Sequence, residues 1–190
     1  MSQPRIISGS ARGIRIDSVP GDTTRPITDR VKEALFNIIG PDIIDSSFLD
    51  LFGGTGSVGI EALSRGAKKC LFLDLAPQAN LTIKKNLERT RLTNQASVRQ
   101  MDAYHFLANP IEIDFDYLYI APPQYKGMWI KALELINSHP QLISADGWVI
   151  VQIDPVEFTD ISFENLIEFD RRKYGSTLLL FFSKPQYYSE

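Results

Sequence analysis

Short runs of apolar residues alternate with amphipathic stretches from residue 47 onward. The apolar runs predict five strands: Phe48–Phe52, Lys69–Asp74, Ser97–Met101, Phe115–Ile120 and Trp148–Ile153. The stretches between them predict helices near Val58–Arg65, Gln78–Arg91, Tyr104–Leu107 and Gly127–Asn137. Strands that are apolar on both faces and separated by helices are typical of a parallel sheet covered on both sides. The pattern therefore predicts an α/β fold.

The last part of the chain has a different pattern. Leu166–Arg172 and Thr177–Ser183 read as strands on either side of the turn-rich segment Lys173-Tyr174-Gly175-Ser176. This spacing predicts an antiparallel hairpin that ends an otherwise parallel sheet.

Residues 1–46 form an N-terminal arm in our interpretation. Arg5–Ile7 and Gly13–Ile16 flank Ser8-Gly9-Ser10-Ala11, which predicts a β-hairpin. Thr28 is a good N-cap for a helix that ends near Ile39. The arm is too short to hold a core of its own, so we predict a single domain over residues 1–190, with the catalytic core at 47–184.

Composition narrows the class of protein only a little. The net charge of −3 gives no global argument for nucleic acid, although Arg5, Arg12 and Arg15 are the only charges before Asp17. A solvated face explains such a cluster equally well, as it does Arg171-Arg172-Lys173. The one cysteine fits a reducing compartment, and neither a signal peptide nor a transmembrane run is evident, so we expect a cytoplasmic protein. With isolated histidines we expect no metal site.

The segment from Asp50 to Gly59 carries the strongest chemical signal. A predicted strand ends there and turns at once into a helix through glycines at 54, 56 and 59. Glycines let the backbone approach a ligand closely, and a helix start offers unpaired N–H groups. The spacing also matches the dinucleotide fingerprint G-x-G-x-x-G, with Asp74 at the end of the next strand. We therefore predict a loop that binds a nucleotide-type cofactor.

Two features favour S-adenosylmethionine (SAM) over a dinucleotide. Asp50 would repel a pyrophosphate but attract an ammonium or sulfonium centre, and 190 residues are too few for a dinucleotide domain plus a substrate domain. We predict that Asp50 lies near the methionine end, with the loop residues Phe52, Gly54 and Gly56 against the cofactor. Asp74 then binds the ribose, and Asp102 meets the adenine amine. Each acid has a plainer alternative as a helix or turn cap, and the two roles are compatible.

A second constellation follows the fourth strand. Ala121-Pro122-Pro123-Gln124-Tyr125 contains adjacent prolines, which fix the backbone and leave carbonyls free to accept hydrogen bonds. At the carboxyl end of a central strand this predicts a rigid acceptor platform, with Tyr125 or Trp129 available to stack on a flat substrate. Alternatively, the prolines only end the strand and Trp129 belongs to the core.

The chain resembles the RsmD family, the bacterial 16S ribosomal RNA guanine-N2 methyltransferases, over nearly its whole length. The matching segments are Arg5–Gly9, Arg25–Asn37 (RPITDRVKEALFN) and Asp50–Gly66. The second is the most specific, because glycine loops occur in all SAM enzymes. The resemblance implies a Rossmann-like class I SAM-dependent methyltransferase fold, with a mostly parallel seven-stranded sheet and an arm involved in RNA or active-site recognition.

One position departs from the family. The family usually has Asp or Asn before Pro-Pro and an aromatic residue after it, whereas this chain has Ala121 and Gln124, with Tyr125 one place later. The missing oxygen normally accepts a hydrogen bond from the target amine. Either the carbonyls of Ala121 and Pro122, helped by Gln124, replace it, or another residue does, or activity has been lost.

The resemblance implies methyl transfer from SAM to the N2 amine of a guanine, with ribosomal RNA or a small-subunit particle as partner and a monomeric enzyme. Five arginines are candidates for holding RNA phosphates: Arg5, Arg12, Arg15, Arg25 and Arg30. Arg25 and Arg30 have an alternative role in ion pairs with Asp29 or Glu33. The competing hypotheses are a catalytically impaired SAM- or RNA-binding protein, a methyltransferase of another nucleic acid or a small molecule, and an NAD-dependent enzyme.

Overall fold

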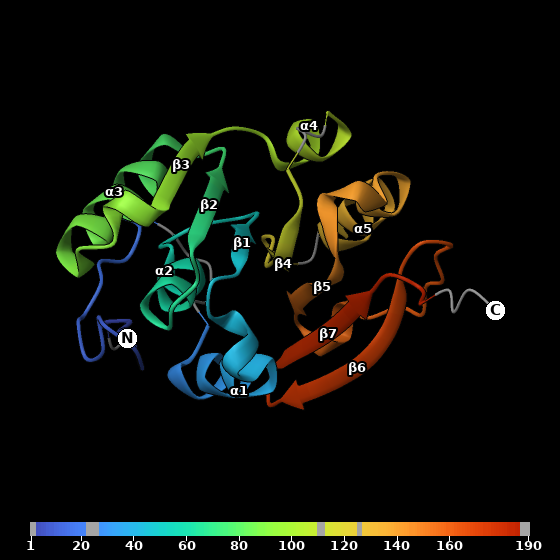
Figure 1. Cartoon of the computed structure of the whole chain (residues 1–190), viewed down its shortest axis with the longest axis horizontal. Helices are drawn as coiled ribbons and strands as arrows, with labels where there is room; N and C mark the ends of the chain where they lie inside the picture. Colours follow the sequence, from blue (N-terminus) through green and yellow to red (C-terminus); the bar gives the residue numbers. More distant parts are fainter. Residues whose placement is uncertain (1–2, 22–26, 110–112, 125–126, 187–190) are drawn as a thin grey trace. The chain divides into compact units, whose positions relative to one another are not determined.

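The chain divides into two compact units, Met1–Ala103 and Tyr104–Glu190. This computed structural model describes residues 3–21, 27–109, 113–124 and 127–186. Each unit has its own strands and helices (Figure 1). The prediction of a single domain over the whole chain stays a prediction. Of the described helices, none is long and apolar enough to cross a membrane.

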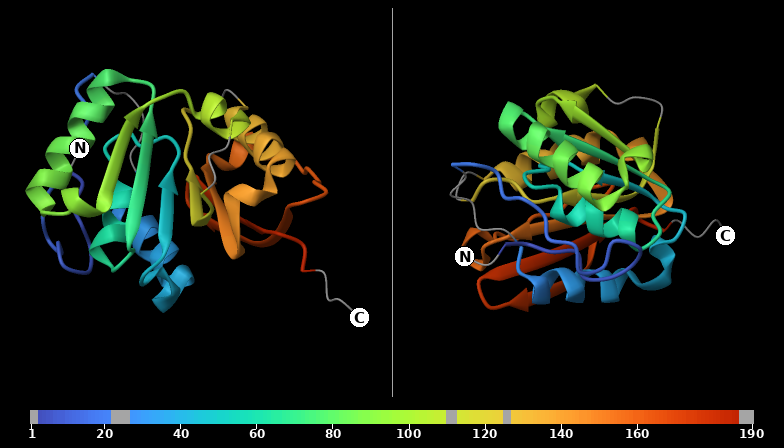
Figure 2. Two further views of the ribbon diagram at one scale, coloured as in Figure 1. Left: turned by 45° about the horizontal axis from the view of Figure 1, so that its top comes forward. Right: turned by 90° about the vertical axis from the view of Figure 1, so that its left-hand side faces the viewer.

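Three parallel strands form the sheet of the first unit, in the order β3-β2-β1. Its elements are α1 (Asp29–Ile39), η1 (Gly40–Ile43), β1 (Ser47–Asp50), α2 (Ser57–Ser64), β2 (Lys69–Asp74), α3 (Pro77–Thr90), η2 (Thr93–Gln95) and β3 (Ala96–Gln100). Helix α2 packs against β1 and β2, and α3 packs against β2 and β3, beside which it runs in Figure 2. All of β1 and the middle of β2 are buried, which explains their nearly continuous apolar sequence.

The second unit contains the other four strands, in the order β4-β5-β7-β6. Its elements are β4 (Phe115–Ile120), α5 (Met128–Ser138), η3 (Pro140–Leu142), β5 (Ile143–Ile153), η4 (Pro155–Glu157), β6 (Ile167–Tyr174) and β7 (Thr177–Ser183), and α4 (Ala103–Ala108) begins at the unit boundary. Strands β4 and β5 are parallel, whereas β7 is antiparallel to both β5 and β6. The predicted terminal hairpin is therefore confirmed, with Gly175 in its turn at φ 59°.

The predicted boundaries hold closely for β2, β4, β7 and α1. Strand β5 starts at Ile143 instead of Trp148, because it continues through the polar segment before Trp148, where the Ser144 hydroxyl donates to Asp116 at 2.8 Å. Strand β1 ends at Asp50, two residues before the predicted end, because Leu51 and Phe52 already belong to the turn.

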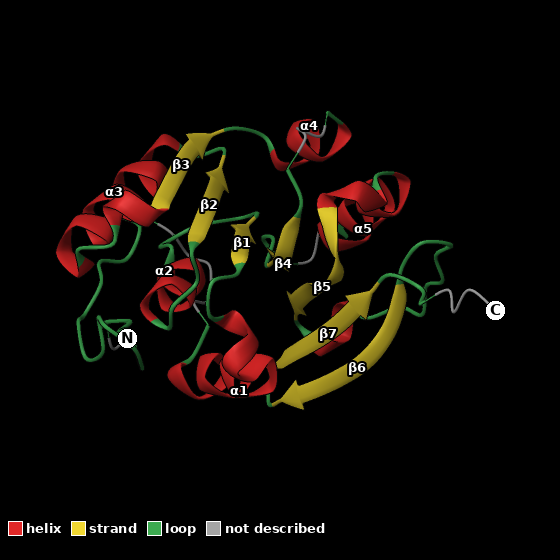
Figure 3. Cartoon of the chain, in the orientation of Figure 1, coloured by secondary structure: helices red, strands yellow, loops and turns green. Residues whose placement is uncertain are grey.

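The first described segment of the N-terminal part, residues 3–21, is the arm proper and is irregular in structure (Figure 3). The predicted hairpin is reduced to one antiparallel bridge between Arg5 and Arg15. The predicted N-cap of α1 is confirmed, since Thr28 Oγ1 accepts a hydrogen bond from the Val31 N–H at 3.3 Å.

Side chains of α2 hold the arm through hydrogen bonds to the arm's main chain. The N–H groups of Ile7 and Ser8 donate to the Glu61 carboxylate at 2.8 and 3.0 Å, and the Ala11 N–H donates to Ser64 Oγ at 2.9 Å. The arm also approaches α2 closely at Gly9, where a Cβ would lie 1.7 Å from the Ser64 carbonyl oxygen. Gly9 has φ +81°, so both space and conformation require glycine at this position.

Candidate functional site

The glycine-rich segment after β1 is tied to the end of β2 by hydrogen bonds. The Gly53 N–H donates to the Leu73 carbonyl at 2.7 Å, and the Gly54 N–H donates to Asp74 Oδ2 at 2.9 Å. Within the segment, the Gly56 N–H donates to the Gly53 carbonyl at 2.7 Å. The loop is therefore a defined turn that brings Gly54 beside the predicted ribose-binding acid.

The glycines of this segment have different surroundings, and these explain why glycine occurs at each position. A Cβ at Gly53 would lie 2.7 Å from Ile83 Cδ1, and one at Gly59 would lie 2.3 Å from the Phe72 ring. Gly56 has φ +76° and is also crowded, with Ile60 Cδ1 at 3.2 Å. At Gly54, with φ +53°, the nearest atom to a Cβ would be the Phe52 carbonyl oxygen at 4.0 Å. The protein's own packing explains three of the glycines, and the space over Gly54 is open.

Asp74 combines capping with an available carboxylate. Its Oδ1 accepts the Ala76 N–H at 2.9 Å, at the start of α3, while Oδ2 accepts the Gly54 N–H. The side chain is only partly buried. A carboxylate has about four lone-pair sites, so further hydrogen bonds from a diol remain available. Asp74 thus caps the turn before α3, whose own N-cap is Ala76, and its predicted ribose role stays a prediction.

Asp50 is buried at the end of β1, with 2% of its surface exposed. Its Oδ2 accepts the Gly59 N–H at 3.2 Å, so it also serves the first turn of α2. Burial raises the pKa of Asp50 to about 7, against a smaller lowering by the Gly59 hydrogen bond and a further raising by the Asp74 charge. A desolvated carboxylate of this kind is stabilised by a cation beside it, and binding near a cationic methionine end stays a prediction.

The remaining predicted cofactor residues follow two different strands, β1 and β3. Phe52 follows β1 and is partly buried, and Asp102 is partly buried directly before α4. Sequence reasoning missed Leu75, whose side chain is 63% exposed next to Asp74. A large apolar side chain exposed beside the predicted ribose site is suited to packing on a purine, and its position directly after the strand-end acid is the signal for it.

Sequence reasoning also missed two buried polar side chains that hold the loop from within the protein. Asn86 Nδ2 donates to the Thr55 carbonyl at 2.9 Å, and Lys32 Nζ donates to Ser57 Oγ at 2.9 Å. The sequence signal that could have found them is their spacing from apolar residues of the same helix. Asn86 lies three residues after the apolar Ile83, and Lys32 lies four residues before Phe36, so both fall on the buried face of their helix.

The segment after β4 is described up to Gln124. Ala121, Pro122 and Pro123 are partly buried and Gln124 is exposed, while Tyr125 lies outside the described residues. Trp129 is 1% exposed in α5, so the alternative that it belongs to the core is correct and the proposed stacking on a substrate is wrong.

The predicted phosphate-binding arginines fall into two groups. Arg5 forms an ion pair with Asp29, at 2.7 Å between Nε and Oδ2. Asp29 thus pairs with Arg5, not with Arg30 as one alternative had it. Arg12, Arg15 and Arg30 are exposed, and Arg25 lies outside the described residues. In the second unit, Arg171 and Arg172 form ion pairs with Glu168 and Asp170, which favours a solvated face there.

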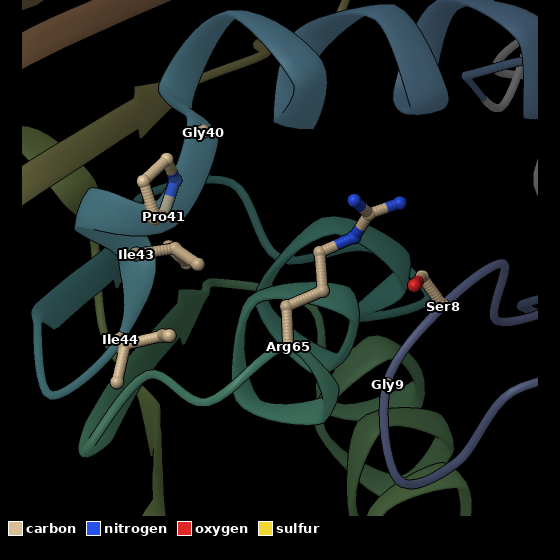
Figure 4. Close-up of a pocket in the computed structure, with 7 residues that line it drawn as sticks. All are labelled: Ser8, Gly9, Gly40, Pro41, Ile43, Ile44 and Arg65. Carbon is tan, nitrogen blue, oxygen red and sulfur yellow. The ribbon is translucent and has the colours of Figure 1, made fainter.

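A shallow pocket of about 230 Å³ also lies in the first unit, beside the arm. In Figure 4 Ser8 and Gly9 form one side of it, Ile43 and Ile44 the other, and Arg65 lies between them.

Burial raises the pKa of the Cys70 thiol, which fits a structural cysteine. No cluster of three or more possible metal ligands occurs among the residues that the structure describes.

Comparison with known proteins identifies the family. Residues 4–183 match the family model described as "Conserved hypothetical protein 95". The chain is 38% identical over 182 residues to the "Putative rRNA methyltransferase YlbH" of Bacillus subtilis, covering 95% of this chain and 98% of that protein. It is 40% identical to the "Ribosomal RNA small subunit methyltransferase D" of Haemophilus influenzae, over 70% of this chain and 69% of that protein.

A solved structure shares the whole fold. "Putative methyltransferase yhhF from Escherichia coli" has a TM-score of 0.84 and 27% identity, covering 96% of this chain and 98% of that one. The α/β class I methyltransferase fold expected from the sequence is therefore confirmed. With a family model that spans nearly all of the chain and these relatives, the protein belongs to the RsmD family, as the Arg25–Asn37 segment led us to expect.

Proposed function

We propose that this protein transfers a methyl group from SAM to the N2 amine of a guanine in 16S ribosomal RNA. The observation that carries the proposal is the loop around Gly54, which has open space above the glycine and the Asp74 carboxylate at its side. Relatives named as ribosomal RNA methyltransferases support RNA as the substrate.

The residues of the loop fit SAM. The Asp74 carboxylate keeps acceptor capacity for the two ribose hydroxyls, and Leu75 offers an apolar surface for the adenine. Asp50 is a buried carboxyl group whose charged form a neighbouring ammonium or sulfonium would stabilise. When bound, SAM supplies a methyl group on a positively charged sulfur, which is reactive enough to need no metal.

The chain's part in the reaction is to bind and orient. The prolines at 122 and 123 fix the backbone and leave main-chain carbonyls free to accept hydrogen bonds from the exocyclic amine, and Gln124 adds a side-chain acceptor. The amine then loses a proton to solvent. Arg12, Arg15 and Arg30 are exposed cations suited to phosphates of the RNA.

The test is methyl transfer from tritiated SAM to 16S RNA and to small-subunit particles, both from cells that lack the endogenous enzyme. We expect label in one of these substrates, and nucleoside digestion should place it on N2-methylguanosine. Label on another nucleoside would overturn the guanine-N2 assignment. Absence of transfer with intact binding of S-adenosylhomocysteine (SAH) would favour the second candidate, a SAM- and RNA-binding protein, to which Ala121 points.

A substitution at Ala121 tests how the amine is held. Ala121→Asn supplies the side-chain oxygen that the family usually has before Pro-Pro, and a single such hydrogen bond in a dry site changes the rate by about 10²-fold. We expect kcat to rise by about that factor at unchanged SAH affinity. Gln124→Ala is the matched control and should lower kcat if Gln124 is the substitute acceptor. An unchanged rate in both variants would mean that main-chain carbonyls alone hold the amine.

A further inference from the structure

Two buried side chains connect the arm to the cofactor loop. Lys32 Nζ donates to the Arg5 carbonyl at 2.7 Å and to Ser57 Oγ at 2.9 Å. Asn86 Nδ2 donates to the Asp17 carbonyl at 3.0 Å and to the Thr55 carbonyl at 2.9 Å. Arg5 and Asp17 lie toward the two ends of the docked part of the arm, and Thr55 and Ser57 are the two neighbours of Gly56 in the loop.

We propose that Lys32 and Asn86 are positioning residues that couple docking of the arm to the shape of the cofactor loop, so that arm docking and cofactor binding strengthen each other. The proposal deepens the proposed function and rests on it. It assigns the arm a role in cofactor binding in addition to the contacts with RNA expected of its arginines.

Both hydrogen-bond donors of the Asn86 side chain are used. It is completely buried, and its Oδ1 accepts the Asp17 N–H at 2.7 Å while both Nδ2 hydrogens are used by the carbonyls of Asp17 and Thr55. A buried polar group that loses its partner costs the full desolvation penalty. A shift of the Thr55 carbonyl must therefore either break a buried hydrogen bond or move Asn86 together with Asp17.

Lys32 makes the second connection from a different helix. It is 1% exposed, and its ammonium lies 3.5 Å from the carboxylate of Glu61, which itself accepts the arm's Ile7 and Ser8 N–H groups. A buried cation is destabilised when it loses one of its hydrogen-bond or ion-pair partners. Withdrawal of the arm would remove the Arg5 carbonyl from Lys32 and leave the cation with Ser57 and Glu61, which weakens the support of the first residue of α2.

Coupling between two sites is reciprocal in free energy. If the docked arm favours the binding-competent loop, then a bound cofactor must favour the docked arm by the same factor. The arm is docked through hydrogen bonds of its main chain, so its stability can be read from amide exchange, residue by residue.

The first experiment measures SAH affinity by calorimetry for the wild type, Asn86→Ala and Lys32→Met. Asn86→Ala and Lys32→Met each lack one of the two side chains that connect the arm to the loop. We therefore expect the dissociation constant of SAH to rise by about five- to tenfold in each variant. Ser64→Ala weakens docking of the arm at Ser8 and Ala11 without a contact to the loop, so under the coupling it should also raise the dissociation constant of SAH. Thr82→Val is the control for a buried polar side chain of α3, whose hydroxyl bonds only within its own helix.

The first part of the second experiment uses the wild type alone. Amide exchange of the wild type is measured with and without saturating SAH, and the Asp17 N–H should exchange more slowly when SAH is bound. In Asn86→Asp, which keeps the acceptor for the Asp17 N–H but loses both donors, this protection should disappear while the Ala11 N–H stays as slow as in the wild type.

The possible outcomes distinguish failure of the coupling from failure of the proposed function. A wild type that binds SAH while its Asp17 amide is unaffected, or folded variants that bind SAH within about twofold of the wild type, overturns the coupling alone. A wild type that does not bind SAH overturns the proposed function, and the coupling falls with it. Slower exchange at Asp17 together with weaker binding by both variants establishes the coupling.

Discussion

The carboxylate of Asp50 is the residue whose chemistry depends most on its surroundings. It is buried, its hydrogen-bond donor is the Gly59 N–H, and burial raises its pKa to about 7 from an ordinary value of 3.8. Without a cation beside it, the charged form is disfavoured in the folded protein. At neutral pH the free protein therefore contains a group poised between its neutral and charged forms.

This raised pKa predicts a pH dependence of stability. Because the folded pKa lies above the unfolded one, the stabilisation from protonated Asp50 is complete below pH 3.8 and is lost as the pH rises through about 7. Asp50→Asn mimics the protonated form. Relative to this variant, the wild type should lose about 1.4 kcal/mol of unfolding free energy per pH unit between pH 5 and pH 7. Urea unfolding of both proteins across that range measures the difference, and a constant gap would contradict the prediction.

At the scale of elements, the contact of α2 with β2 depends on Gly59. A Cβ there would lie 2.3 Å from the Phe72 ring and 2.8 Å from Cys70 Sγ. Gly54, five residues earlier, faces open space instead. The same loop therefore contains one glycine that the fold needs and one that the ligand is proposed to need.

Alanine at these two positions should separate stability from binding. Gly59→Ala overpacks the contact between helix and sheet and should lower the unfolding free energy by about 1–3 kcal/mol. Gly54→Ala costs about 1 kcal/mol for its left-handed backbone but should lower SAH affinity more than tenfold, since the Cβ fills the ligand's space. Urea unfolding and calorimetry measure the two effects, and equal SAH affinity of the wild type and Gly54→Ala would place the ligand elsewhere.

The order and type of the main elements were predictable from the sequence, for definite reasons. Buried parallel strands such as β2 read as apolar runs, and Thr28 marked the start of α1. The arm was not predictable in the same way, because its hairpin consists of one bridge and its docking depends on Glu61, Ser64 and Asn86. A polar residue inside a helix reads as surface unless its spacing is noticed, and its partner in a distant loop leaves no local pattern.

At the scale of the whole molecule, the net charge of −3 means that RNA binding must depend on local cations. Arg12 and Arg15 are exposed on the arm, whereas Arg5 is compensated by Asp29. Arg12 and Arg15 thus remain as exposed cations of the arm, because the nearest acid in sequence, Asp17, forms an ion pair with Arg89.

The double variant Arg12→Gln/Arg15→Gln should weaken RNA binding and lower its dependence on salt. Each lost phosphate contact reduces the slope of log affinity against log salt by about one. Arg172→Gln is the matched control, because Arg172 is paired with Asp170. Filter binding to the proposed 16S substrate at several salt concentrations measures both slopes, and identical slopes for the wild type and the double variant would remove the arm from the RNA interface.

Docking of the arm depends only in part on which amino acids the arm contains. Most of the hydrogen bonds that fix it use main-chain atoms of Arg5, Ile7, Ser8, Ala11 and Asp17, beside the side-chain ion pairs of Arg5 with Asp29 and of Asp17 with Arg89. Every amino acid except proline presents the same N–H and carbonyl groups. The side chains of Arg12 and Arg15 are exposed and take no part in these contacts, so exchanging them should change the proposed RNA contacts of the arm and leave its docking intact.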